Sequence, residues 1–397
     1  MSIKPTSTIA SSVMLPLAVL AIAGAVTPAS ASSTPTKDHV LTVLHAFAGG
    51  TDGANPNTTM VADKAGNLYG TTYNGCTDGS VYKIAPNGTE TVLYCFTGTP
   101  GSGNPGGGLM IDKLGNLYGT TESGGDNDAG TVYKIAADGT FTLLYSFLDG
   151  TQGGVPIGSL VLYKKDLYGT VFSGGANGQG AVFKLTPNGK ETILYSFTGG
   201  TDGGEPYAGL VVDKAGNLYG TTNNGGDPTC SCGTVYEITP SGQETTLHDF
   251  VGGTDGSSPG EPHLILSTAG DLYGVTSAGG NSNNGTIYKI AANGTESVLY
   301  AFTGGDDGKV PVSRLLLGST GTLFGTTYEG GADGFGTVFK LTPNNKLRVM
   351  YTFTGGLDGC YSAAGLVDDA AFQKGYLYGA AADCGANGDG TIFSITK

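Results

Sequence analysis

The segment GLVVDKAGNLYGTT at residues 209–222 is the clearest indication of the fold, because its core recurs along the chain. The steps between successive copies of its tripeptide Leu-Tyr-Gly are 49, 50, 51, 54, 51 and 54 residues. A nearly constant period of this size indicates a repeat architecture. The copies, one of them Leu-Phe-Gly, begin at Leu68, Leu117, Leu167, Leu218, Leu272, Leu323 and Leu377.

Each repeat contains four short runs that are typical of β-strands. In one copy they are Leu210–Asp213, Leu218–Thr222, Thr234–Ile238 and Thr245–Phe250. The runs are rich in β-branched and aromatic residues, and Gly, Pro, Asn and Asp separate them as turn formers. Four strands in a repeat of about 50 residues predict a β-propeller blade, and seven repeats predict an all-β, seven-bladed propeller.

The two ends of the repeat region predict how the ring closes. Residues 41–47 match the fourth strand of a repeat, whereas the last copy ends with a third strand at residues 391–395. We therefore expect the N-terminal strand to complete the last blade, so that no blade keeps an unpaired edge there. The predicted organisation is a signal peptide over residues 1–31, a short linker over 32–40 and one propeller over 41–397.

The N-terminal segment predicts export. Lys4 precedes an apolar run over residues 13–26, and Ala29-Ser30-Ala31 forms a small-residue cleavage site. This run is too short for a stable transmembrane span, and no later stretch of the sequence is long and apolar enough to be one. We expect a secreted monomer, extracellular or periplasmic, cleaved near Ala31.

Composition narrows the classes of partner. The formal charge is −14 at pH 7, which disfavours nucleic acid because phosphate binding needs clustered Lys and Arg. The 71 glycines follow no G-x-y period, so collagen is excluded. Hydrophobic residues make up 39% of the chain, which excludes disorder by composition.

Six cysteines in an exported chain predict disulfides. A bridge between the last two would join loops that share one face of the last blade. The two cysteines of the fourth repeat stand one residue apart, so they form either a small ring or free thiols. A zinc site is the weaker alternative, since the chain has no C-x-x-C pair and only four histidines. The local pairs are Cys76 and Cys95, Cys230 and Cys232, and Cys360 and Cys384.

The repeated motif Gly-Gly-Thr-Asp-Gly is interpreted as a turn between blades. A ring of its carboxylates could bind Ca²⁺, but Asp-Gly is ordinary turn chemistry. Ser102 and Gln152 also interrupt the ring. We therefore expect no metal and no other cofactor. The aspartates concerned are Asp52, Asp202, Asp255, Asp307 and Asp358.

The tyrosine of the Leu-Tyr-Gly tripeptide has two interpretations. A ring of tyrosines could stack on sugars, but the residue lies in a strand that neighbouring blades should cover. We therefore predict packing between blades, with the following glycine allowing sheets to approach closely.

The whole unit resembles a known family. The segment GLVVDKAGNLYGTT, a Gly-Gly pair, a GTVYKI-like strand, a PNG turn and an LYSFTGGTDG-like end together resemble the Gloeo/Verruco (GloVer) tandem-repeat family of exported bacterial proteins. The resemblance covers residues 41–397. It implies export and a repetitive β structure, with no agreed activity. The Gly-Gly pair also resembles kelch blades, but the chain has no tryptophan.

Positions that break the repeat predict a site. Two repeat positions lie just outside the predicted inner strand: the position directly before it and the position two places earlier. In most copies both carry small or uncharged residues. Copies four to six instead place Tyr207, Glu261, His263 and Arg314 there, with Glu205 close by. We expect these residues to line one arc of the mouth of the central channel, since departures from a local pattern concentrate at functional sites. Neutral drift of an exposed loop is the alternative.

Two functions are compatible with this site. The favoured one is a non-catalytic binding or scaffold module for an extracellular glycan or protein, because the sequence has no G-x-S-x-G, H-E-x-x-H or phosphate-loop motif. The alternative is an extracellular hydrolase or lyase acting on a polysaccharide or small molecule. Glu261, His263 and Arg314 would then be the catalytic candidates, with Glu205 and Tyr207 binding the ligand.

Overall fold

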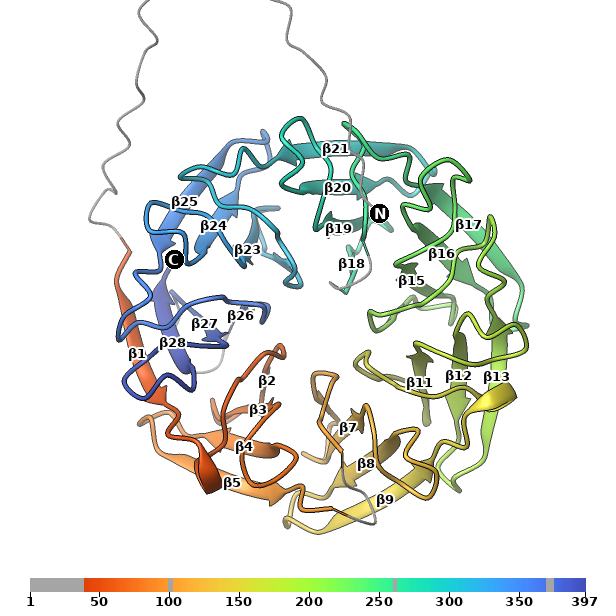
Figure 1. Cartoon of the computed structure of the whole chain (residues 1–397), viewed down its shortest axis with the longest axis horizontal. Coiled ribbons are helices and arrows are strands. Elements are labelled where there is room, and N and C mark those ends of the chain that lie inside the picture. Colours follow the sequence, from red (N-terminus) through yellow and green to blue (C-terminus); the bar gives the residue numbers. More distant parts are fainter. Residues whose placement is uncertain (1–38, 99–102, 260–262, 369–374) are drawn as a thin grey trace, which may run out of the picture. The chain divides into compact units, whose positions relative to one another are not determined.

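A computed structural model describes residues 39–98, 103–259, 263–368 and 375–397. The chain divides into two units, Met1–Thr36 and Lys37–Lys397, and every described residue belongs to the second. In this unit seven four-stranded antiparallel sheets form a ring around a central channel (Figure 1). The predicted seven-bladed propeller is confirmed. The predicted signal peptide lies outside the described residues.

Each blade has an inner, a second, a third and an outer strand. The inner strands are β2 (Val61–Ala62), β6 (Met110–Ile111), β10 (Val161–Tyr163), β14 (Val211–Val212), β18 (Ile265–Leu266), β22 (Leu316–Leu317) and β26 (Val367–Asp368). The second strands are β3 (Leu68–Thr72), β7 (Leu117–Thr121), β11 (Asp166–Val171), β15 (Leu218–Thr222), β19 (Leu272–Thr276), β23 (Leu323–Thr327) and β27 (Tyr376–Ala381). The third strands are β4 (Ser80–Ile84), β8 (Thr131–Ile135), β12 (Ala181–Leu185), β16 (Thr234–Ile238), β20 (Thr286–Ile290), β24 (Thr337–Leu341) and β28 (Thr391–Thr396). The outer strands are β5 (Glu90–Cys95), β9 (Phe141–Ser146), β13 (Glu191–Ser196), β17 (Glu244–Asp249), β21 (Glu296–Ala301), β25 (Leu347–Thr352) and β1 (Leu41–Ala46).

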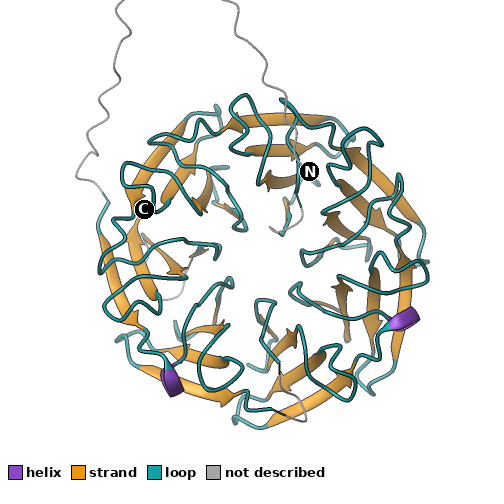
Figure 2. Cartoon of the chain, viewed as in Figure 1, coloured by secondary structure: helices purple, strands orange, loops and turns teal. Residues whose placement is uncertain are grey.

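Helical structure is minimal. Two single 3₁₀ turns, η1 (Gly50–Asp52) and η2 (Gly150–Gln152), lie in loops between blades (Figure 2). Among the described residues, no helix has the length and apolar character needed to span a bilayer.

The ring closes through the two ends of the repeat region. Strand β1 pairs antiparallel with β28, with Leu41 opposite Ile395 and Ala46 opposite Thr391. The N-terminal strand is therefore the outer strand of the last blade, as the leftover strands predict. A β-bulge recurs in every blade between the third and outer strands. Because a bulge increases local twist, it helps the outer strand to follow the circumference.

The core lies between neighbouring blades. Val81 and Phe96 of blade one pack with Leu109 and Leu117 of blade two, and Tyr69 of the first Leu-Tyr-Gly tripeptide covers this cluster. The predicted role of that tyrosine in packing between blades is confirmed.

The glycine of the tripeptide has a different partner from the one predicted. Gly220 stands opposite Tyr236 within the same blade, and a Cβ at Gly220 would lie 2.6 Å from Cζ of Tyr236. The third-strand aromatic ring therefore lies directly on the glycine. Close approach between two sheets is not the main reason for glycine at this position.

All six cysteines are paired as their local grouping indicates. Disulfides join Cys76 to Cys95, Cys230 to Cys232 and Cys360 to Cys384. The Thr-Asp-Gly aspartates serve as turn formers, as expected. In the loop after β13, the Asp202 carboxylate accepts hydrogen bonds from the Thr198 amide at 2.8 Å and the Tyr195 hydroxyl at 2.8 Å.

Candidate functional site

The central channel contains two chambers that share some of their lining residues. The strand chamber, about 450 Å³, is lined by the inner strands of blades one to five and is mostly apolar. The loop chamber, about 170 Å³, is lined mainly by the loops that precede the inner strands. Both chambers share Thr59, Ser159, His263 and Arg314, which we call the constriction residues. All four occupy the same repeat position, two residues before an inner strand. His263 and Arg314 are the two that depart from the small side chains found there in the other copies.

Hydrogen bonds between neighbouring blades, several of them from the second strands, fix the backbone next to the constriction residues. The Thr170 hydroxyl donates to the Ala208 carbonyl of the next blade at 2.9 Å, and Thr326 reaches the Ala364 carbonyl at 3.3 Å. The Gly365 amide of blade seven donates to the Thr59 hydroxyl of blade one at 2.9 Å. In blades three and six, the threonine after the tripeptide thus links blade packing to the shape of the channel.

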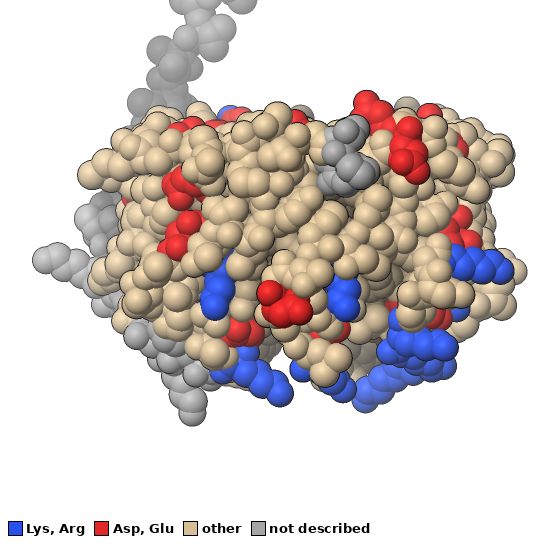
Figure 3. All heavy atoms as spheres, turned by 90° about the horizontal axis from the view of Figure 1, so that it is seen from below, with Lys and Arg blue, Asp and Glu red and all other residues tan. Residues whose placement is uncertain are grey.

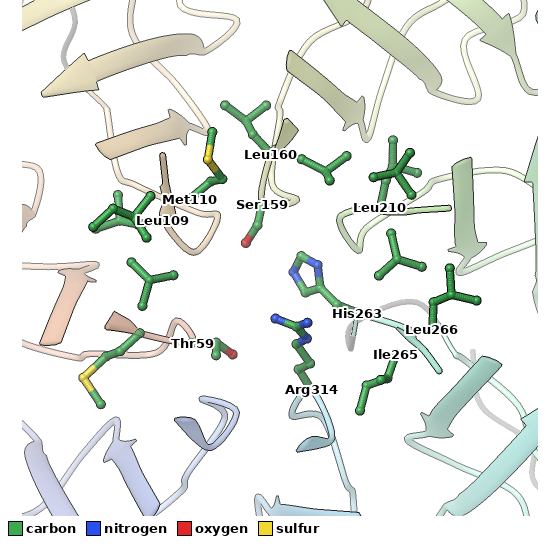
Figure 4. A pocket seen from close by; sticks show the side chains of 16 residues that line it. Thr59, Leu109, Met110, Ser159, Leu160, Leu210, His263, Ile265, Leu266 and Arg314 are labelled. Atoms are coloured by element: carbon green, nitrogen blue, oxygen red, sulfur yellow. The ribbon is translucent and has the colours of Figure 1, made fainter. Parts of the chain in front are cut away.

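Small residues make room for the two unusual side chains. A Cβ at Gly209 would lie 2.6 Å from Nδ1 of His263, and a Cβ at Gly365 would lie 3.0 Å from Cβ of Arg314. Figure 4 shows His263 and Arg314 projecting toward one another into the lumen. Two glycines therefore allow an imidazole and a guanidinium to occupy a ring that elsewhere carries small side chains.

The guanidinium and the imidazole titrate differently from free side chains. Desolvation inside the ring, followed by the positive charge of Arg314, lowers the pKa of His263 to about 3. The imidazole is therefore neutral at pH 7. Arg314 is accessible to channel water but surrounded by protein, and this partial desolvation lowers its pKa from the usual value. It keeps its charge, because arginine stays protonated in proteins.

Arg314 has no hydrogen bond or ion pair with any described residue. It is also the only cation among the described residues that line the two chambers. Because a desolvated charge is costly unless it is paired, this guanidinium is suited to an anionic ligand.

The other predicted residues have different positions. Tyr207 lines the loop chamber, and its ring meets Phe172 edge-to-face at 5.9 Å between centroids. Glu205 lines neither chamber, and its carboxylate accepts a hydrogen bond from the Asn224 amide. Glu261 lies outside the described residues. The structure thus brings Tyr207, His263 and Arg314 to one cavity.

Glu122 is a channel residue that the repeat pattern did not predict. It lies in the loop after β7 and is the only carboxylate among the described residues lining the chambers. Burial raises its pKa, although the Tyr73 hydroxyl donates to it at 3.4 Å. A Cβ at Gly106 would meet its side chain at 2.9 Å or less, so this glycine makes room for it. The sequence did contain one signal for this residue: Glu122 differs from the residues that follow the other second strands.

The two faces of the ring differ in charge. On the side shown in Figure 3, Lys and Arg gather toward the lower face, whereas Asp and Glu lie mainly toward the upper face. In the first six blades, the turns between the inner and second strands lie at the same end of the blades, because all these blades have the same antiparallel strand order. Lys64, Lys113 and Lys214 occupy such turns.

The family of the chain follows from comparison with known sequences. The Gloeobacter/Verrucomicrobia repeat model matches residues 24–231 and 228–397, so the chain belongs to this repeat family. The comparison with curated proteins finds no match.

Solved structures share the fold at low sequence identity. The extracellular domain of a "putative one component system" from B. thetaiotaomicron has a TM-score of 0.55 and 10% identity, over 90% of this chain and 40% of that one. A "putative 6-phosphogluconolactonase" from Bacteroides uniformis has a TM-score of 0.52 and 18% identity, over 79% and 88% of the two chains. A "putative gluconolactonase" has a TM-score of 0.44 and 12% identity, over 91% and 93%. The two likenesses with a TM-score above 0.5 concern the fold alone.

Proposed function

We propose that this protein is an exported binding module whose channel holds a small ligand with an anionic group, such as an acidic sugar of a glycan. The observation that carries the proposal is the guanidinium of Arg314 in the channel, which has no hydrogen bond or ion pair with a described residue. A carboxylate on the ligand would pair with it through two parallel N–H···O bonds. The three disulfides fit an oxidising compartment and thus export.

The loop chamber suits the rest of such a ligand. Asn57 and Ser159 offer an amide and a hydroxyl, Tyr207 offers an aromatic ring, and Glu122 can accept hydrogen bonds from sugar hydroxyls. The Oδ1 atom of Asn57 is buried without a hydrogen-bond partner among the described residues. A polar ligand would satisfy it, since an unpaired buried acceptor is unfavourable.

The binding experiment compares charged and neutral saccharides. Mature protein is screened on a glycan array, and hits are titrated by calorimetry with Arg314→Ala and with Arg348→Ala as the matched control. Arg348 lies exposed on outer strand β25, far from the channel lining. Loss of a charge-assisted hydrogen bond costs about 1.5–3 kcal/mol, so Arg314→Ala should weaken binding about 10-fold to 100-fold. Equal affinity of the two variants would refute the proposal.

A second candidate function is supported by one pair of residues. The loop chamber holds a carboxyl group whose pKa is raised, Glu122, and an imidazole whose pKa is lowered, His263. A carboxyl group with a raised pKa can act as a general acid, and an imidazole with a lowered pKa can act as a general base, in a hydrolase or lyase. Turnover of an array hit that Glu122→Gln and His263→Ala both abolish would establish catalysis. Binding without turnover would leave the non-catalytic function.

A further inference from the structure

The perimeter between blades four and five brings three metal-ligating side chains together. His248 lies in outer strand β17, Asp255 lies in the loop that follows, and Glu296 begins outer strand β21. One nitrogen or oxygen from each lies within 4.8 Å of the others, and all three residues are half-buried. We call this group the perimeter triad. It is separate from the channel.

The hydrogen bonds of the triad leave one carboxylate oxygen without a partner. The Nε2 atom of His248 lies 3.2 and 3.3 Å from the two carboxylate oxygens of Asp255. Asp255 Oδ2 also accepts a hydrogen bond from the Val251 amide at 2.8 Å, which fixes this carboxylate. Glu296 Oε1 is buried and has no hydrogen-bond partner among the described residues.

We propose that the perimeter triad binds a divalent transition-metal ion of the Zn²⁺ type. His248 Nε2, an Asp255 oxygen and a Glu296 oxygen would be its ligands, with water in the fourth position. Two ligands bound at 2.0–2.1 Å in a tetrahedral site stand about 3.3 Å apart, close to the 3.2 Å between His248 and Asp255. One nitrogen and two carboxylates suit Zn²⁺ better than Ca²⁺, which takes six to eight oxygens.

The repeats provide an internal comparison. At the equivalent place between blades three and four, Tyr195 replaces the histidine, and its hydroxyl donates to Asp202 at 2.8 Å. Burial raises the pKa of Tyr195, so the phenol stays neutral and is a poor ligand. Glu244 still begins the next outer strand. The change from tyrosine to histidine therefore replaces a hydrogen bond within the turn with a third side chain that can bind a metal ion.

A second set has the same residue types but a looser arrangement. His45 Nε2 lies 3.1 Å from Asp52 Oδ1, and the buried Oε1 atom of Glu90 has no partner among the described residues. In the described part of the chain, only the perimeter triad brings three ligand atoms within 4.8 Å of one another. We therefore expect the first equivalent of metal at the perimeter triad.

Bound metal would connect neighbouring blades. Asp255 belongs to the loop that leaves blade four, whereas Glu296 belongs to blade five. Since a ligand that binds only the folded state stabilises it, the metal should raise the unfolding temperature.

The test titrates ZnCl₂ into mature protein that has been freed of metal with EDTA and dialysed. Calorimetry should show a first equivalent with a Kd in the micromolar range, and thermal unfolding should shift upward. His248→Tyr recreates the arrangement of blade three and should fold normally by circular dichroism, with the first equivalent weakened at least tenfold. Glu296→Gln should do the same. His263→Ala removes the channel imidazole and should leave the titration unchanged.

Three outcomes would overturn the metal site. They are an unchanged first equivalent in both His248→Tyr and Glu296→Gln, no binding by the unaltered protein at millimolar Zn²⁺, and tighter binding of Ca²⁺ than of Zn²⁺. Loss of the first equivalent in His263→Ala alone would move the site to the channel and would equally refute the assignment.

Discussion

Replacing Tyr236 with phenylalanine should stabilise the propeller. The side chain of Tyr236 is fully buried, and its hydroxyl has no hydrogen-bond partner among the described residues. Burial raises the pKa of this phenol, so it remains a neutral O–H that needs an acceptor. Three other blades already carry phenylalanine at the equivalent position, namely Phe183, Phe339 and Phe393.

The magnitude follows from the cost of an unpaired polar group. A buried donor without an acceptor costs about 1–3 kcal/mol, so each substitution should add about 1 kcal/mol. Tyr82, Tyr133 and Tyr288 repeat the situation of Tyr236, and all four lie in different blades. Since distant sites contribute additively, the fourfold variant should gain about 4 kcal/mol.

The assay is guanidinium denaturation followed by circular dichroism, with the midpoint and slope fitted for each variant. The midpoint should rise while the slope stays constant. Tyr195→Phe is the control, because its hydroxyl donates to Asp202, and it should lose about 1 kcal/mol. A fourfold variant that is less stable than the unaltered protein would refute the reasoning, since it would mean that these hydroxyls are satisfied.

Three further predictions concern the channel, pH and the disulfides. Gly209→Ala places a Cβ 2.6 Å from Nδ1 of His263, so binding of the anionic saccharide should fall at least tenfold by calorimetry. Burial raises the pKa of Glu191 to about 7 from 4.5, so its contribution to stability is full below pH 4.5 and is lost as pH rises to 7. Glu191→Gln should therefore gain on the order of 1 kcal/mol at pH 8 and nothing at pH 4, allowing for solvent screening, in paired denaturation curves. Replacing Cys360 and Cys384 with serine opens a loop with a sequence separation of 24 residues and should cost about 3 kcal/mol in the same assay; an unchanged midpoint would contradict this.

The fold could be predicted because each repeat encodes it locally. The run Leu218–Thr222 matches strand β15 to the residue, since its turn residues and alternation leave no other register. Ring closure could be predicted because the repeat region begins with an extra fourth strand and its last copy ends with a third strand. The inner strand was harder: β14 covers only Val211–Val212, because the chain turns at Asp213 to accept hydrogen bonds from Asn217.

The site was only partly visible in the sequence. His263 and Arg314 were identifiable because they replace small residues at one repeat position. Glu122 follows a second strand at a position that varies between copies, so a single departure there carried little signal. The perimeter triad comes from three separate elements, and its Asp255 is indistinguishable in sequence from an ordinary turn aspartate. Only the tertiary packing of adjacent blades brings its members together.

A crystal structure of the protein with a bound acidic saccharide would show whether the channel is the binding site. We expect the ligand in the loop chamber, with its carboxylate paired to Arg314 and its ring near Tyr207. Saccharide bound on the outer surface while the loop chamber holds only solvent would contradict it.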